Sequence, residues 1–128
     1  MKKICLFLLL GLCSLPTLAA DASVQVSTIT EGYGPSPAEN DVVKVHYHGT
    51  LLDGTVFDSS LSKGPATFSL SSVIPCWTAG LQAMHVGETA QIVCPPAFAY
   101  GSRGVQGRIP PNSTLVFEVQ LLEIMKRK

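Results

Sequence analysis

The sequence lacks an excess of either charge. Nine lysine and arginine residues balance nine aspartate and glutamate residues, and charged residues make up only 14% of the chain. Proteins that bind nucleic acids usually carry a basic patch or stripe. The basic run at residues 126–128 (KRK) is too short for such a footprint and is typical of a solvated tail. We therefore expect no nucleic-acid partner.

An apolar run long enough to cross a membrane is also absent, since spanning takes about 20 residues. Residues 4–12 are almost wholly apolar, but the run is short, follows a positively charged start and precedes the small residues of 16–20. This is the three-part pattern of a secretory signal peptide. We expect residues 1–20 to be removed after Ala19 or Ala20. The mature protein would then be periplasmic or secreted, with no membrane attachment.

Cysteine is scarce outside the predicted signal peptide, which holds Cys5 and Cys13. Leu12 stands before Cys13 where a lipoprotein signal needs a small residue, so no lipid anchor is expected. Cys76 and Cys94 are too far apart for a C-x-x-C redox motif. Thiols in an oxidising compartment often pair, and the loop of about 18 residues would be worth roughly 3 kcal/mol. The residues leave open a disulfide or two buried thiols.

Motifs for covalent or metal chemistry are missing as well. There is no G-x-S-x-G sequence of the kind that positions the nucleophile in serine hydrolases. His46 and His48 fall on one face of a predicted strand, but two histidines make a poor metal site, because structural zinc usually has four ligands. We expect no metal and no cofactor.

What the sequence does contain is a series of short alternating segments, which are typical of half-buried strands. An Asp53-Gly54 pair joins two of them and is a strong hairpin signal, because glycine tolerates the positive φ of tight turns. The predicted strands cover residues 24–29, 43–48, 51–57 in the hairpin, 67–70, 88–94 and 115–121. Residues 21–40 form an N-terminal strand and loop, and residues 41–128 form the main domain.

One segment has helical periodicity. Trp77, Leu81 and Met84 recur at the spacing of one helix face, Pro75 suits a first helical position, and Gly87 ends the pattern. So short a helix must be stabilised by burying its apolar face on the sheet. The sequence therefore predicts an α+β domain, an antiparallel sheet of five to six strands with one short helix across it.

The stretch from residue 95 to residue 113 is rich in glycine and proline and shows no regular periodicity. Irregular loops this long in compact domains are usually functional or disordered. Phe98 and Tyr100 supply two large apolar anchors, which favours an ordered functional flap.

Together these segments resemble the FKBP-type peptidyl-prolyl cis–trans isomerase domain. The resemblance covers about residues 41–124. It lies in the motifs at 45–51 (VHYHGTL), 53–54 (DG), 57–60 (FDSS), 73–77 (VIPCW), 99–101 (AYG), 109–112 (IPPN) and 114–117 (TLVF). Residues 64–68 (GPATF) and the short connection to Val73 are most similar to bacterial macrophage-infectivity-potentiator isomerases. Those proteins carry a long helical dimerisation segment ahead of the domain, whereas about 20 residues stand here, so we expect a monomer.

The resemblance implies a half-barrel sheet wrapped on the helix, with an apolar pocket between them. It implies catalytic roles for Tyr47, Phe57, Asp58 and Tyr100, and substrate binding by Val73, Ile74, Trp77, Ile109 and Phe117. Trp77 would form the pocket floor. The Tyr100 hydroxyl and the Ile74 N–H would each hold a substrate carbonyl, and Asp58 would hydrogen-bond Tyr47.

Several residues depart from the family pattern. Ala66 stands in place of an aromatic on one pocket wall, and the arginine usual near Asp58 has no clear equivalent around Ser62 and Lys63. Val105 replaces a flap histidine, Arg108 an apolar neighbour, and Cys76 the glycine before the tryptophan. These changes bear on affinity and sequence preference, including affinity for the macrolides that inhibit this family.

Two functions follow from the resemblance. The first is isomerisation of X–Pro bonds in exported proteins, which would assist their folding. The alternative is a non-catalytic peptide-binding or holdase module of the same fold. The presence of Tyr47, Phe57, Asp58, Trp77 and Tyr100 favours the enzyme.

Overall fold

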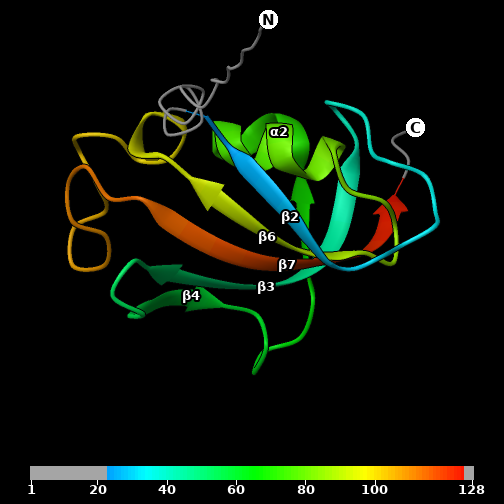
Figure 1. Ribbon diagram of the computed structural model, residues 1–128, viewed down its shortest axis with the longest axis horizontal. Coiled ribbons are helices and arrows are strands. Elements are labelled where there is room, and N and C mark those ends of the chain that lie inside the picture. Colours follow the sequence, from blue (N-terminus) through cyan, green and yellow to red (C-terminus); the bar gives the residue numbers. More distant parts are fainter. Residues whose placement is uncertain (1–22, 126–128) are drawn as a thin grey trace, which may run out of the picture.

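The computed structural model describes residues 23–125; the predicted signal peptide and residues 126–128 lie outside this range. The described chain forms a six-stranded antiparallel sheet with one α-helix on one face (Figure 1). Strands run in the order β2-β6-β7-β3-β4, and β5 also pairs with β3. Their bounds are β2 Gln25–Thr30, β3 Val42–Leu51, β4 Val56–Ser59, β5 Ala66–Ser69, β6 Thr89–Cys94 and β7 Leu115–Met125. The α+β prediction is confirmed.

The sheet core follows the alternation of β3 and β7, its longest strands. Val43 and Val45 of β3 are fully buried, as are Leu115, Val119 and Leu121 of β7. The residues between them face outward because successive side chains of a strand point to opposite sides. The N-terminal strand β2 pairs with β6 and so belongs to the same sheet as the rest of the chain.

The helix α2, Pro75–Gln82, lies across the concave side of the sheet (Figure 1). Pro75 occupies its first turn, and Trp77 and Leu81 are buried beneath it. Gly80 disfavours a helix by propensity, but a Cβ there would come within 3.0 Å of the Ile92 side chain on β6. The glycine therefore permits the close approach of α2 to the sheet. Within residues 23–125, no helix has the length and hydropathy to cross a membrane.

A disulfide joins Cys76 in the first turn of α2 to Cys94 at the end of β6. The two Cα atoms lie 5.7 Å apart, and both residues are fully buried. Of the two states that the sequence left open, the structure has the bonded one. The bond fastens the N-terminal end of the helix to the sheet.

The flap between β6 and β7 is ordered by its own hydrogen bonds. It begins with the 3₁₀ turn η3, Pro96–Phe98. Val105 and Ile109 exchange backbone hydrogen bonds of 2.8 Å in both directions, and Asn112 N–H donates to Gly101 O at 2.8 Å. Ile109 is only 5% exposed, so its side chain anchors the flap to the core.

Candidate active site

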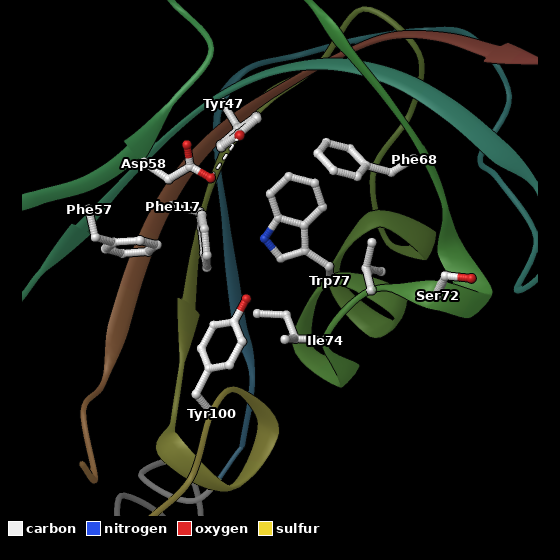
Figure 2. Close-up of a pocket in the computed structure, with 10 residues that line it drawn as sticks. Tyr47, Phe57, Asp58, Phe68, Ser72, Ile74, Trp77, Tyr100 and Phe117 are labelled. Atoms are coloured by element: carbon white, nitrogen blue, oxygen red, sulfur yellow. Dashed lines mark hydrogen bonds between the residues drawn. The ribbon is translucent and has the colours of Figure 1, made fainter. Parts of the chain in front are cut away.

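The sheet, α2 and the flap enclose a cavity of about 490 Å³ (Figure 2). Its lining comes from segments far apart in the sequence. The lining residues are Tyr47, Phe57, Asp58, Phe68, Ser72, Val73, Ile74, Trp77, Tyr100 and Phe117. The cavity is mostly apolar with a few polar groups, which is the usual character of a ligand site.

Eight of the nine predicted pocket residues meet in this cavity. Ile109 is the exception, because the bridge to Val105 holds it in the flap, beside a different hollow. Sequence reasoning missed Phe68 and Ser72. Phe68 shares a face of β5 with Ala66, two residues away, so strand alternation was the signal that pointed to it.

Trp77 lies at the centre of the cavity's aromatic side chains. Its ring meets those of Tyr47, Phe68 and Phe117 edge-on, with centroids 5.2–5.4 Å apart. Phe57 packs edge-on against Phe117 at 5.4 Å. Such edge-to-face pairs are each worth about 0.5–1.5 kcal/mol beyond their buried area. The rings therefore form a preorganised cup with Trp77 as its floor.

Gly49 makes room for one wall of this cup. A Cβ at this position would lie 2.7 Å from the Phe57 ring and 3.0 Å from the Phe117 ring. Gly49 sits on β3 opposite Phe117 of β7. Any side chain here would push the two rings apart, which explains the glycine within the motif at 45–51.

The polar rim is built around Asp58. The Tyr47 hydroxyl donates to Asp58 Oδ2 at 2.9 Å, and the Ser59 backbone N–H donates to Oδ1 at 2.9 Å. Lys63 Nζ lies 4.0 Å from Oδ1. The predicted Tyr47–Asp58 hydrogen bond is thus confirmed, and Lys63, in the stretch where the sequence offered no clear equivalent of the family's arginine, stands beside the carboxylate.

Three hydrogen-bond donors of the cavity lack a protein partner. Trp77 Nε1 is buried without one among the described residues. The Ile74 N–H and the Tyr100 hydroxyl likewise have no hydrogen-bond partner recorded within residues 23–125. In Figure 2 the Tyr100 hydroxyl reaches toward the cavity beside Ile74. These donors are available to the carbonyl groups of a ligand.

His46 and His48 lie on the other face of β3, away from the cavity. Nδ1 of His46 is 2.9 Å from Ser60 Oγ, and Nδ1 of His48 is 3.0 Å from Ser59 Oγ. Within residues 23–125, no group of three potential ligands is arranged to hold a metal ion. The histidines serve here as hydrogen-bond partners of Ser59, the last residue of β4, and of Ser60, which follows it.

Comparison with known proteins assigns this arrangement to a family. Residues 34–122 match the family model described as FKBP-type peptidyl-prolyl cis-trans isomerase. The chain belongs to the FKBP-type isomerase family. The match runs from ahead of β3 into β7, and therefore includes every residue that lines the cavity.

Bacterial FKBP-type isomerases are among the proteins that this chain matches. The chain is 49% identical over 108 residues to the FKBP-type 22 kDa peptidyl-prolyl cis-trans isomerase of Escherichia coli K12, covering 84% of this chain and 52% of that one. It is 47% identical over 106 residues to the outer membrane protein MIP of Legionella longbeachae, covering 82% and 46%. The crystal structure of FkpA from Escherichia coli superposes with a TM-score of 0.77 at 44% identity, covering 80% and 48%. The chain spans about half the length of these relatives.

The structure shows what surrounds two of the residues that depart from the FKBP-type family pattern. Ala66 leaves one wall without its usual ring, but Phe68 packs against Trp77 at 5.2 Å and against Tyr47 at 5.8 Å. Lys63 takes a position near Asp58 where the sequence offered no arginine. Its side chain is 70% exposed, so the pair is screened by water and worth little as a stabilising ion pair.

Tyr47 remains a neutral hydrogen-bond donor over the physiological range. Burial of the ring, followed by the hydrogen bond to Asp58 and that residue's negative charge, raises the pKa of Tyr47 from 10.0 to about 12. A raised pKa means that the folded state holds this proton more tightly than the unfolded state does. The stability it contributes is complete below pH 10 and is lost as the pH rises through 12.

We expect a Tyr47→Phe variant to be less sensitive to alkali than the wild type. Between pH 10 and 12 the wild-type free energy of unfolding should fall more steeply, because only it carries the raised phenol pKa. Urea titrations across this range measure the difference. Tyr33→Phe is the control, since Tyr33 is 88% exposed. Equal slopes for wild type and Tyr47→Phe would contradict the assignment.

Proposed function

We propose that this chain is an exported peptidyl-prolyl cis–trans isomerase that turns X–Pro bonds in folding polypeptides. The observation that carries the proposal is the aromatic cup around Trp77 with unpartnered donors at its rim. A proline ring is apolar and therefore suits the aromatic cup. The carbonyl groups that flank it are hydrogen-bond acceptors and therefore suit the unpartnered donors.

The reaction needs differential binding rather than bond chemistry. Rotation about an X–Pro bond faces a barrier of about 18–20 kcal/mol because the amide loses conjugation when twisted. It takes about 10–100 s uncatalysed, and reaching milliseconds means lowering the barrier by about 5–6 kcal/mol. A site achieves this by binding the twisted amide more tightly than either planar form.

Each part of the cavity suits a step of this binding. Trp77 as floor and Phe57 and Phe117 as walls would hold the proline ring and exclude water, which otherwise stabilises the planar, dipolar amide. Loss of that hydration favours the twisted form. The Tyr100 hydroxyl and the Ile74 N–H would each donate a hydrogen bond to a substrate carbonyl, fixing the chain on both sides of the rotating bond.

Asp58 would act on the rotating group itself. Tyr47 and the Ser59 N–H each engage one of its oxygens at 2.9 Å, so the carboxylate is held in place before substrate arrives. Its negative charge would then face the carbonyl carbon of the residue before proline. Val73 would contact the substrate from the cavity wall. Ile109, buried in the flap beside a different hollow, would hold the flap in place rather than touch the substrate.

The proposed setting is a periplasmic or secreted one, with proline-containing polypeptides as clients. The Cys76–Cys94 disulfide supports export, because such bonds persist in oxidising compartments. We propose a monomer, without membrane attachment after signal cleavage, that binds macrolide inhibitors in the same cup. Ala66 would weaken that binding by leaving one wall open.

An isomerisation assay on proline-containing peptides tests the proposal. Wild type should accelerate cis–trans exchange, and Asp58→Ala should lower kcat/KM about tenfold, as expected for loss of one charge-assisted interaction. Tyr100→Phe should lower it several-fold through loss of one neutral hydrogen bond. Asp53→Ala is the charge-matched control, because Asp53 lies in the exposed β3–β4 turn outside the cavity.

The holdase alternative gives a different pattern. A non-catalytic module would show no acceleration in any variant, while suppressing aggregation of an unfolded protein equally in all of them. The isomerisation and aggregation assays are then repeated with saturating macrolide. An effect that depends on the cup should be lost when the macrolide fills it, and an effect that arises elsewhere should persist. No acceleration by the folded wild type would overturn the enzyme proposal.

A further inference from the structure

A second apolar hollow lies on the outer side of α2. It has a volume of about 570 Å³, and we call it the helix groove. Its lining residues are Val24, Val73, Pro75, Thr78, Ala79, Gln82 and Phe98. It is bounded by the start of β2, the exposed side of α2 and η3 of the flap. None of the lining side chains is charged.

Both polar side chains of the helix groove already donate hydrogen bonds within the protein. Thr78 Oγ1 donates to Leu70 O at 2.6 Å, and Gln82 Nε2 donates to Thr78 O at 2.8 Å. Both donors therefore serve the fold. What remains for a ligand is apolar surface, including Phe98, which is 36% exposed, and the exposed Ala79. Such a surface would select an uncharged, apolar side chain.

The helix groove and the candidate active site share a wall. Val73 lines both hollows. The flap also serves both, since Phe98 lines the groove and Tyr100, two residues further on, lines the active-site cavity. A polypeptide crossing Val73 would pass directly from one hollow into the other.

We propose that the helix groove is a subsite for an apolar side chain of the client polypeptide, flanking the proline held in the cup. The inference rests on the proposed function and adds a preference to it. An extended chain advances about 3.3–3.6 Å per residue, so residues two to four positions from the proline lie roughly 7–14 Å away. The groove would make the enzyme favour prolines with an apolar residue two to four positions away on one side.

Matched peptides and one charge insertion test this subsite. The peptides are a tetrapeptide that fills only the cup, and longer peptides carrying a single leucine or serine at one of the positions two to four residues from proline on either side. Wild type should show a kcat/KM about tenfold higher for leucine than for serine at one position, the effect of burying about half of a leucine side chain.

Ala79→Glu should abolish that preference while leaving tetrapeptide turnover unchanged, because residue 79 lines the groove and not the cup. Glutamate is a good helix former, so the exposed helix position tolerates it. Ala38→Glu is the matched control, since Ala38 is exposed in a loop and lines neither hollow. A preference that survives Ala79→Glu, or its absence in wild type, would overturn the subsite.

Crosslinking identifies the occupant directly. The photoreactive amino acid p-benzoylphenylalanine, placed at residue 79 of the full chain, should couple to the leucine peptide. A covalent dimer would show that a second copy covers the groove, and an internal crosslink to residues 1–22 would show that the chain covers it itself. Either result would overturn the inference. Absence of tetrapeptide turnover by the wild type would count against the proposed function instead, and crosslinking would still decide the subsite.

Discussion

Breaking the Cys76–Cys94 disulfide should lower the free energy of unfolding by about 3 kcal/mol, the value for a loop of this length. The bond closes a loop of 18 residues between α2 and β6, so it restricts the unfolded chain more than the folded one. Urea titrations of the wild type, with and without a thiol reductant, measure the loss. Unfolding exposes the buried bond to the reductant, so its access to the native protein does not limit the experiment.

A Cys76→Ala/Cys94→Ala variant is the control for this result. It should unfold at a similarly low urea concentration and should not respond to the reductant. Since both sulfurs are fully buried, alanine also removes packing, and the variant should be slightly less stable than the reduced wild type. An unchanged midpoint for the reduced wild type would contradict a stabilising disulfide.

The disulfide also bears on the proposed activity through its place in the chain. Cys76 lies between Ile74, which lines the cavity, and Trp77, which forms the floor of the cup. Fastening Cys76 to β6 therefore fixes both groups relative to the sheet. Reduction should weaken substrate binding as well as stability. A KM that rises while kcat changes little is the expected form of this effect.

Local patterns in the sequence were sufficient to predict the strands and the helix, because strand alternation and helix spacing involve residues close together in the chain. The alternation of β3 and β7 identified which side chains are buried, because a strand's faces repeat every two residues. Pro75 and the spacing of Trp77 and Leu81 located α2. The family resemblance then brought the pocket residues together, although they come from elements far apart along the chain.

The features that sequence reasoning missed depend on long-range geometry. Phe68 meets Trp77 only because β5 pairs with β3 in the register that sets Phe68 opposite Val43. Ile109 leaves the cavity because the flap closes on Val105. Neither the register of two distant strands nor the closure of a glycine-rich loop can be read from a local pattern.

The disulfide illustrates the same limit. Whether Cys76 and Cys94 can bond depends on how closely α2 approaches β6. That approach is possible because Gly80 leaves no Cβ above Ile92. The spacing of the cysteines alone could not distinguish a bonded pair from two buried thiols, whereas the packing of the helix brings their Cα atoms to 5.7 Å.

Trp77→Leu should cost both stability and activity. The substitution removes three edge-to-face ring contacts at 5.2–5.4 Å and leaves the cup without its floor. We expect a loss of about 3 kcal/mol in unfolding free energy, in the range for large core truncations. The value of kcat/KM should fall at least tenfold, since a floorless cup binds the twisted amide no better than the planar forms.

Leu81→Ala separates these two effects. Leu81 is fully buried on the same helix but does not line the cavity, and its truncation should cost a similar amount, about 3 kcal/mol. Per folded molecule, its kcat/KM should stay near the wild-type value. If Leu81→Ala lost as much activity as Trp77→Leu, general loosening of the helix would explain both. A loss confined to Trp77→Leu would assign it to the ring at the cavity floor.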